Sequence, residues 1–395
     1  MKSIFYPALF GFVVALILQA GQTGQAGSAD LQPTSQAVGK VKLLRTPNGG
    51  LQPQVALDER GVLHMVYFTG EPQGGDIYYV RRDAGKTEFA SPLRVNSEPG
   101  SAIAIGTIRG AQLAIGKNGR VHVAWNGSHD LGGRGAPMLY ARMNDAHTGF
   151  DPQVNVMQFS GGLDGGGSIA ADKSGNVYVA WHGKGDKEGE ENRRVWVARS
   201  TDEGKTFSRE NAAWNDPTGA CGCCGMRAFA DRQGRAHLLY RAATERVDRD
   251  MYLLSSDDRG QSFSGLLLDK WKLNACPMSS AALADGATGL LAAWETQGQV
   301  YFASLDPKKQ RQISPIPAPG GTGKRRHPMI AANSRGETML VWTEGTGWKK
   351  GGSFAWQLYD AQGKPSGEVG AAEGIPAWSF AAVVAESDGS FTIFY

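Results

Sequence analysis

One pattern of apolar and polar positions recurs along the chain and predicts pairs of short strands. Each copy has an apolar run, Asp or a substitute, Gly three residues later, and Tyr or Trp six residues after that glycine. The fifth copy keeps its Asp285 and Trp294 but places its glycines differently. Asp opens a tight turn by bonding to its own backbone, and Gly supplies the positive φ. The aromatic residues that end the copies are Tyr67, Trp125, Trp181, Tyr240, Trp294, Trp342 and Tyr395.

Two further strands follow most copies. The predicted third strands are 77–82, 138–143, 195–200, 251–256, 300–305 and 354–359, and a weaker fourth strand follows, as at 89–96. Four antiparallel strands form one propeller blade, and successive aromatics lie 48 to 59 residues apart, a period typical of propellers. The sequence therefore predicts an all-β fold, a seven-bladed β-propeller that occupies residues 39–395 as a single domain.

The two ends of this domain are expected to meet. The seventh copy stops after its second strand, at Tyr395, and the segment 41–46 is a strand without partners of its own. Pairing of this N-terminal strand with the last blade would close the ring and leave no blade with exposed edges.

The N-terminus has the features of a secretory signal. Lys2 is followed by an apolar stretch at 4–18, with cleavage expected after Ala20 or Ala29. The alternative is a membrane anchor, but about 15 apolar residues are short for a span, which needs about 20. We therefore expect a signal peptide and leader at 1–29, a flexible segment at 30–38, a secreted or periplasmic protein, and no stable membrane span after cleavage.

Composition excludes some partners. The net charge is only +3, with 20% charged and 41% hydrophobic residues. Such a balance gives no reason to expect nucleic acid or an acidic membrane surface as a partner. No cofactor is indicated, and we expect a monomer.

The turns between third and fourth strands carry a specific motif. Residues 200–207 read STDEGKTF and residues 256–263 read SDDRGQSF. These turns resemble the Asp-boxes of sialidase-like (BNR-repeat) β-propellers, a family with bacterial secreted members. In that family the boxes are structural and lie opposite the active site, and sialidases have six blades, so six is the alternative count. The resemblance makes these residues structural: Ser200, Asp202, Gly204, Thr206, Phe207, Ser256, Asp258, Gly260, Ser262 and Phe263.

The resemblance also sets expectations for the opposite face. A sialidase grips a carboxylate with three arginines and uses a Tyr nucleophile with a Glu partner and an Asp acid or base. The family's Arg-Ile-Pro element is missing, and no loop tyrosine stands out. Asp130, Asp164 and Glu245 are the candidate catalytic carboxylates. The candidate ligand-binding residues are Arg109, Arg227, Arg241, Arg249 and Arg326, with Trp348 and Trp378 in adjacent loops as sugar-stacking surfaces.

All four cysteines lie at the starts of the fourth and fifth blades: Cys221, Cys223, Cys224 and Cys276. In an exported protein the default is two disulfides, here one local bond and one bridge to Cys276. The alternative is a soft-metal site, in which Met226 and Met278 would suit copper(I) and a histidine would suit zinc. His129, His182 and His327 lie in loops of the same face.

Three functions remain open from the sequence. The leading hypothesis is a secreted sialidase-like propeller that binds a glycan or another anionic ligand on its loop face. The first alternative is an exo-sialidase-type glycoside hydrolase, the only enzyme class that the resemblance indicates. The second is a non-catalytic structural or protein-interaction propeller, with or without a soft metal at the cysteines. Because fold alone does not fix function, the loop face decides between them.

Overall fold

The computed structural model describes residues 36–38, 40–128, 135–306, 314–321 and 323–395. The predicted signal peptide and leader (1–29), most of the flexible segment, and Asp130 and His129 lie outside the described residues. Residues 36–38, within that predicted flexible segment, form a strand. The described part contains no helix with the length and apolar character that a membrane crossing requires.

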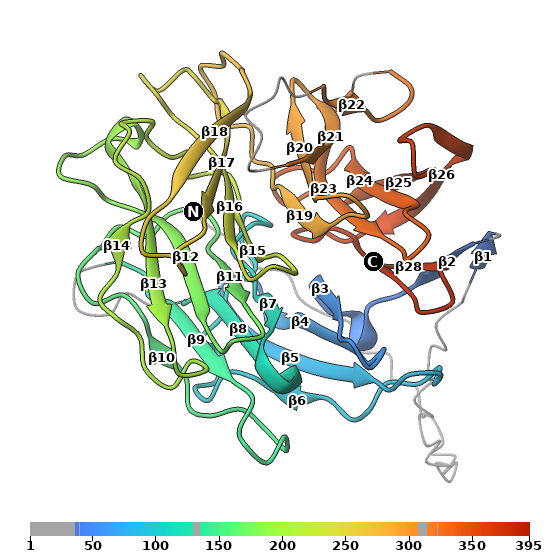
Figure 1. The fold of residues 1–395 in the computed structure, drawn as a ribbon, viewed down its shortest axis with the longest axis horizontal. Helices are drawn as coiled ribbons and strands as arrows, with labels where there is room; N and C mark the ends of the chain where they lie inside the picture. The colour runs from blue at the N-terminus through green and yellow to red at the C-terminus, as the bar shows by residue number, and fades with distance from the viewer. Residues whose placement is uncertain (1–35, 39, 129–134, 307–313, 322) are drawn as a thin grey trace, which may run out of the picture. The chain divides into compact units, whose positions relative to one another are not determined.

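Seven four-stranded sheets make up the fold (Figure 1). Blade 1 contains β3 (Leu51–Leu57), β4 (Leu63–Glu71), β5 (Gly74–Arg82) and β6 (Leu93–Arg94). Blade 2 contains β7 (Gln112–Ile115), β8 (Val121–Asn126), β9 (Met138–Arg142) and β10 (Val154–Asn155). Blade 3 contains β11 (Ser168–Ala171), β12 (Val177–Gly183), β13 (Arg194–Ser200) and β14 (Asn211–Ala212). Blade 4 contains β15 (Arg227–Ala230), β16 (Ala236–Arg241), β17 (Met251–Ser256) and β18 (Ser264–Asp269).

The remaining blades follow the same order. Blade 5 contains β19 (Ala282–Asp285), β20 (Leu290–Thr296), β21 (Gln299–Leu305) and β22 (Ile316–Pro317). Blade 6 contains β23 (Arg325–Ala332), β24 (Thr338–Glu344), β25 (Gly352–Tyr359) and β26 (Pro365–Ile375). Blade 7 contains β27 (Ala382–Ala385), β28 (Phe391–Phe394), β2 (Val41–Leu44) and β1 (Gln36–Val38). The described loops contain three short 3-10 helices: η1 (Pro47–Gly49), η2 (Lys117–Gly119) and η3 (Glu190–Asn192).

The first strands of successive blades contact one another in a closed cycle, from β3 through β7, β11, β15, β19 and β23 to β27 and back to β3. These strands therefore surround the axis, and each blade extends outward from it. The prediction of a seven-bladed propeller is confirmed, and the six-bladed alternative is wrong. The count follows from the repeat, because each predicted hairpin became the first two strands of one blade.

The ends of the domain meet in blade 7, as expected. Strand β2 pairs with the C-terminal strand β28 in parallel, with Leu43 opposite Ile393, and Figure 1 shows the blue and red strands side by side. A third strand of an ordinary blade runs antiparallel to the second. Here β2 runs the other way because its C-terminal end must lead into β3, the innermost strand of blade 1. Strand β1 adds the outermost position.

Apolar side chains pack between neighbouring blades. The repeated aromatics Trp125, Trp181, Trp294 and Trp342 are essentially fully buried. Trp181, for example, lies in one cluster with residues of both blade 2 and blade 3. The aromatic that ends each predicted hairpin therefore fills the space between two sheets, and the repeat encodes the packing of the ring.

The face with the Asp-x-x-Gly turns, here called the turn face, is tied together by polar contacts. In the turn at 200–207, Asp202 accepts hydrogen bonds from Ser200 Oγ (2.7 Å), Thr206 Oγ1 (2.6 Å) and Thr206 N (2.9 Å). Phe207 packs edge-on against Tyr140 of the preceding blade at 4.8 Å between ring centroids. The phenylalanine of this turn thus holds two blades together.

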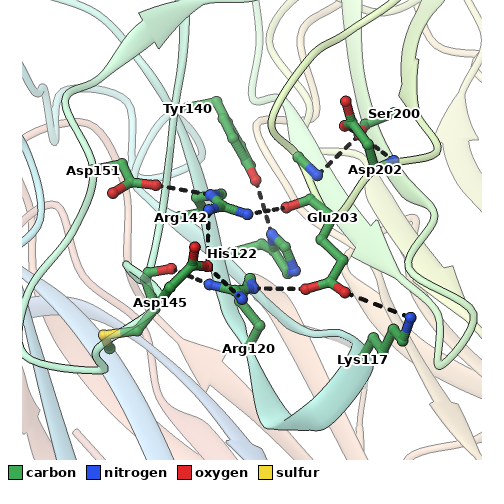
Figure 2. Close-up of polar contacts among 12 residues, drawn as sticks. Lys117, Arg120, His122, Tyr140, Arg142, Asp145, Asp151, Ser200, Asp202 and Glu203 are labelled. Carbon is green, nitrogen blue, oxygen red and sulfur yellow. Dashed lines mark hydrogen bonds and ion pairs between the residues drawn. The ribbon is translucent and has the colours of Figure 1, made fainter.

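Ion pairs join the same two blades (Figure 2). Glu203, in the blade 3 turn, accepts from Arg120 Nε of blade 2 at 2.9 Å, and Lys117 Nζ lies 3.7 Å from it. Arg142 contacts Asp151 at 2.8 Å and Asp145 at 3.1 Å. Each cation here has a carboxylate partner, so this network is scaffold.

Candidate functional site

The loop face, opposite the turn face, carries the connections between blades and between second and third strands. One of them, residues 97–111, crosses the axis and is called the axial loop below. Its tip has left-handed backbone at Gly106 (φ +84°) and at Thr107 (φ +68°). For a β-branched residue this conformation is strained, so the surrounding contacts must hold Thr107 in place.

Ile108 of the axial loop fills the space at the starts of blades 3, 4 and 5. A Cβ on Gly166 would overlap the carbonyl oxygen of Ile108, and a Cβ on Gly225 would lie 3.3 Å from the Cβ atoms of Ile108 and Ser280. Two glycines therefore let the loop approach the inner strands. Ile108 is buried. Ile108 and the glycines around it therefore plug the axis on this face with protein.

A chain of ion pairs runs beside the plug and joins four loops. Asp164 accepts from Arg109 Nη2 at 2.9 Å and from Arg193 Nη2 at 2.8 Å. Arg193 also contacts Glu190 at 3.2 Å, and Glu190 accepts from Arg249 Nη1 at 2.8 Å. The chain contains three cations and two anions, so it carries one net positive charge.

Two tryptophans lie next to this chain. Trp348, in the β24–β25 loop, is 57% exposed, and its ring meets the ring of buried Trp378 edge-to-face at 4.7 Å. Both Trp348 Cζ3 and Arg109 Nη1 lie within 3.8 Å of the position that a Cβ on Gly106 would occupy. The two tryptophans lie in adjacent loops, as predicted, and the structure shows that Arg109 lies beside Trp348.

Arg249 is connected to Arg109 through the ion-pair chain, but Arg227 and Arg241 make separate contacts. Buried Arg241 donates to the backbone carbonyls of Arg249 and Glu295 and lies over the Trp271 ring at 4.9 Å. Arg227 donates to Gln54 Oε1 at 2.8 Å and to Gln112 Oε1 at 2.6 Å.

Arg227 therefore ties blade 4 to blades 1 and 2, and burial lowers its pKa to about 10. The three arginines expected to grip one carboxylate are dispersed over separate internal contacts.

The remaining predicted residues also separate. Arg326 is partly exposed and its backbone carbonyl accepts from Thr343 Oγ1. Glu245 is exposed, with left-handed backbone at φ +49°. Of the three carboxylate candidates, Asp164 alone lies in the ion-pair chain among the described residues, and both of its oxygens contact arginines. Asp164 is therefore a carboxylate that orders two arginines.

The predicted disulfides are not formed. All four cysteines are free, and Cys276 is exposed. A turn in which Cys224 N donates to Cys221 O at 3.3 Å instead draws the sulfurs of Cys221, Cys223 and Cys224 together, within 4.8 Å of one another. The expected bridge from this loop to Cys276 is absent because the three loop sulfurs point to a common centre while Cys276 faces solvent.

Buried titratable groups surround this cysteine loop. His182 is fully buried, and burial lowers its pKa to about 4. Within the described part of the chain, neither ring nitrogen has a hydrogen-bond partner. Glu295 is also buried, which raises its pKa to about 7, and its Oε2 has no hydrogen-bond partner in the described ranges. The sequence predicts that His327, like His182, lies in a loop of this face. Its Nδ1 forms a hydrogen bond with Ser280 Oγ at 3.2 Å.

Sequence reasoning did not single out Arg193 and Glu190, although their three-residue spacing within a charged run suits an ion pair. Gly106 gave no signal, because a glycine in a loop is unremarkable until its neighbours are known. A cavity of about 430 Å³ lies on the turn face, lined by residues that include Arg60, His64, Arg81 and His147. It is remote from the loops described above.

No protein-family model and no curated protein sequence matches the chain. Among solved structures it is similar to a Hadza microbial sialidase, with 13% identity, a TM-score of 0.48 and coverage of 80% of this chain and 73% of that one. A protein of unknown function from Dyadobacter fermentans has 12% identity, a TM-score of 0.49 and coverage of 82% and 94%. A Penicillium chrysogenum α-L-arabinanase has 14% identity, a TM-score of 0.47 and coverage of 83% of this chain and 94% of that one. The fold assignment therefore rests on the seven sheets, and the function on the geometry of the site.

Proposed function

We propose that the chain is a glycan-binding propeller whose site lies around Trp348 on the loop face. The observation that carries this proposal is an exposed indole ring, Trp348, braced by Trp378 and adjacent to Arg109. The apolar face of a sugar ring stacks on an aromatic surface, and its hydroxyls need polar groups at the edge of that surface. Arg109 supplies such polar groups. Of its guanidinium nitrogens, only Nη2 has a hydrogen-bond partner within the described residues, so the others can donate to a ligand.

The charge of the site favours an acidic glycan. The ion-pair chain has one cation more than it has anions. Lys349 and Lys350 follow Trp348 directly and are both exposed. A sugar carboxylate near Trp348 would meet this positive potential, and the guanidinium of Arg109 offers the geometry that suits a carboxylate.

Hydrolysis has less support than binding. Two carboxylates of the loop face, Asp164 and Glu190, are held by arginines, and a third, Glu295, is buried. The tyrosines Tyr240 and Tyr252 belong to strands, and Tyr240 bonds to Thr218 rather than to a glutamate. A binding role uses the exposed tryptophan without needing a free acid and nucleophile.

An array of acidic and neutral glycans, followed by titration calorimetry of each hit, tests the proposal. We expect acidic glycans to bind, and Trp348→Ala to weaken binding about tenfold or more, which corresponds to about 1.4 kcal/mol. Phe159→Ala is the matched control, since Phe159 is also 57% exposed but packs on Trp196 and under Arg209.

Two results would contradict the proposal: no glycan bound at all, or equal affinity in wild type and Trp348→Ala. Weaker binding in high salt is expected for an acidic ligand, because salt screens exposed charges. Release of free sugar from a panel of fluorogenic sialosides would support the exo-sialidase alternative instead.

A further inference from the structure

Three thiols of the loop that leads into blade 4 converge on one point. Cys221 Sγ lies 3.3 Å from Cys223 Sγ and 3.3 Å from Cys224 Sγ. Cys221 and Cys224 are buried, and Cys223 is partly exposed. The cluster is therefore enclosed by protein on one side and reachable from solvent on the other.

Neighbouring blades hold this loop in shape. Cys221 N donates to the carbonyl of Arg241 at 2.9 Å, and Gly225 N donates to the carbonyl of Ser279 at 2.9 Å. Gly222 N donates to Glu190 Oε1 at 3.1 Å, which connects the loop to the ion-pair chain. Residues of blades 3, 4 and 5 thus fix the loop before any ligand arrives, and such preorganisation favours ligation.

The charge around the cluster suits anionic sulfur. Arg241 is 2% exposed, and among the described residues it has no carboxylate within ion-pair distance, only two backbone carbonyls. Arg241 lies beside the cluster, because its carbonyl accepts from Cys221 N. Taking a cation out of water is costly, and thiolates beside Arg241 would compensate its charge.

A buried imidazole lies next to the cluster. The position that a Cβ on Gly165 would occupy is 2.9 Å from His182 Nδ1 and 3.0 Å from the carbonyl oxygen of Cys224. His182 is fully buried, and neither of its nitrogens has a hydrogen-bond partner among the residues that the structure describes. Buried polar side chains almost always have a partner, so this histidine points to a ligand that would complete its surroundings.

We propose that Cys221, Cys223 and Cys224 bind one copper(I) ion through three thiolates, with His182 beside it. Soft thiolates select soft ions such as copper(I), and metal–sulfur bonds of about 2.3 Å place three trigonal sulfurs about 4.0 Å apart. The three sulfurs here lie within 4.8 Å of one another, so small side-chain movements suffice. A structural zinc site needs four ligands, whereas only the three sulfurs, and not His182, belong to the group of described ligand atoms within 4.8 Å of one another. Binding releases the thiol protons to solvent and changes no oxidation state.

Copper(I) titration of the full chain under reducing, anaerobic conditions, against a colorimetric copper(I) chelator, tests the proposal. We expect one ion per chain and a thiolate-to-copper absorption in the ultraviolet. Cys223→Ser, the least buried of the three substitutions, and Cys224→Ser should each weaken binding by about 100-fold or more. His182→Ala should weaken it by about 10-fold to 100-fold, the size of an effect from a neighbouring group. Cys276→Ser is the matched control and should bind like wild type.

Circular dichroism and thermal unfolding of each variant separate loss of the site from loss of the fold. Equal copper(I) affinity in Cys223→Ser and Cys276→Ser would overturn the proposal. So would a purified chain without reactive thiols, whose four cysteines form two disulfides. Tighter binding of zinc than of copper(I), lost in His182→Ala, would overturn the copper assignment. Trp348→Ala should leave copper binding unchanged, so this inference stands or falls separately from the glycan proposal.

Discussion

The pKa of a buried charged residue in this propeller depends on the hydrogen-bond partners that replace water around it, and Asp231 is an example. Asp231 opens the blade 4 turn and is almost fully buried, yet it accepts hydrogen bonds from Arg235 Nε at 2.7 Å and lies 3.0 Å from His237 Nε2. Burial alone would raise the pKa of Asp231, but the bonds from His237 and Arg235 outweigh it and lower the pKa to about 2.

The pKa of Asp231 predicts a loss of stability in acid. Its ordinary value of 3.8 applies to the unfolded chain, so the stabilisation is complete above about pH 4 and disappears as the pH falls through 2. Over this window wild type should lose roughly 2 kcal/mol through Asp231. We expect Asp231→Asn to lose correspondingly less between pH 4 and 2, measured by urea unfolding at several pH values. Parallel pH profiles for wild type and Asp231→Asn would refute this, and Glu245→Gln, at an exposed position, serves as the control.

Arg227 is predicted to stabilise the ring rather than to bind ligand. Arg227→Met would leave Gln54 Oε1 and Gln112 Oε1 without their donor, at a cost of about 1–3 kcal/mol in unfolding free energy. Arg232→Met is the control, because its ion pair with Asp285 is exposed and worth at most about 1 kcal/mol. If Arg227→Met kept its stability in urea but lost glycan binding, the result would contradict a structural role and would support Arg227 as a ligand-binding residue.

At the scale of elements, the starts of the inner strands share one backbone feature. A residue in the left-handed region precedes or opens the inner strand in six blades, at Gln52, Thr107, Gly165, Met278, His327 and Trp378. Five of the six are not glycine, so each carries conformational strain. Because the feature recurs around the ring, it belongs to the scaffold, and its strain is no indication of catalysis.

The turns of the turn face allow a matched test of inter-blade packing. Gly204 has φ +78°, and a Cβ there would overlap the hydroxyl of Tyr140 in the preceding blade. Gly85, in the equivalent turn of blade 1, has φ +73° but nothing within 4 Å of such a Cβ. Gly85→Ala should therefore cost only the left-handed strain, about 1–2 kcal/mol.

Gly204→Ala should cost that strain and a clash, in total about 2–4 kcal/mol. Equilibrium urea unfolding measures both variants. If the two substitutions lowered the unfolding free energy equally, the contact between this turn and Tyr140 would contribute nothing to the association of blades 2 and 3.

The elements were predictable from sequence because each depends on local chemistry. The repeat of apolar run, turn and aromatic gave the hairpins, and the aromatic Trp181 lies between two blades as a ring of sheets requires. The site was less predictable, because it depends on contacts between loops far apart in the chain. Trp348 and Arg109 are more than two hundred residues apart, and no local sequence pattern predicts that the axial loop brings them together. The cysteines were found, but their free state depends on where Cys276 points.

At the scale of the whole ring, closure depends on very few residues. Strand β2 joins the N-terminal part of the domain to β28, and Leu43, 2% exposed, packs in the cluster between blades 6 and 7. If this pairing were lost, β28 would become an exposed edge and blade 7 would keep only two strands, which is marginal for a sheet. The stability of the ring should therefore be coupled to this one short strand.

Leu43→Ala tests this coupling, with Lys42→Ala as the control in the same strand. Removing the buried leucine side chain should lower the free energy of unfolding by about 2–4 kcal/mol, whereas the half-exposed Lys42 should change it by less than about 0.5 kcal/mol. Tryptophan fluorescence and far-ultraviolet circular dichroism, followed together in urea, distinguish two outcomes. A closed ring that unfolds as a unit shifts both transitions to lower urea by the same amount, because opening blade 7 also exposes its neighbours. A new early transition beside an unchanged main midpoint would show that blade 7 opens alone and that closure by β2 does not stabilise the other six blades.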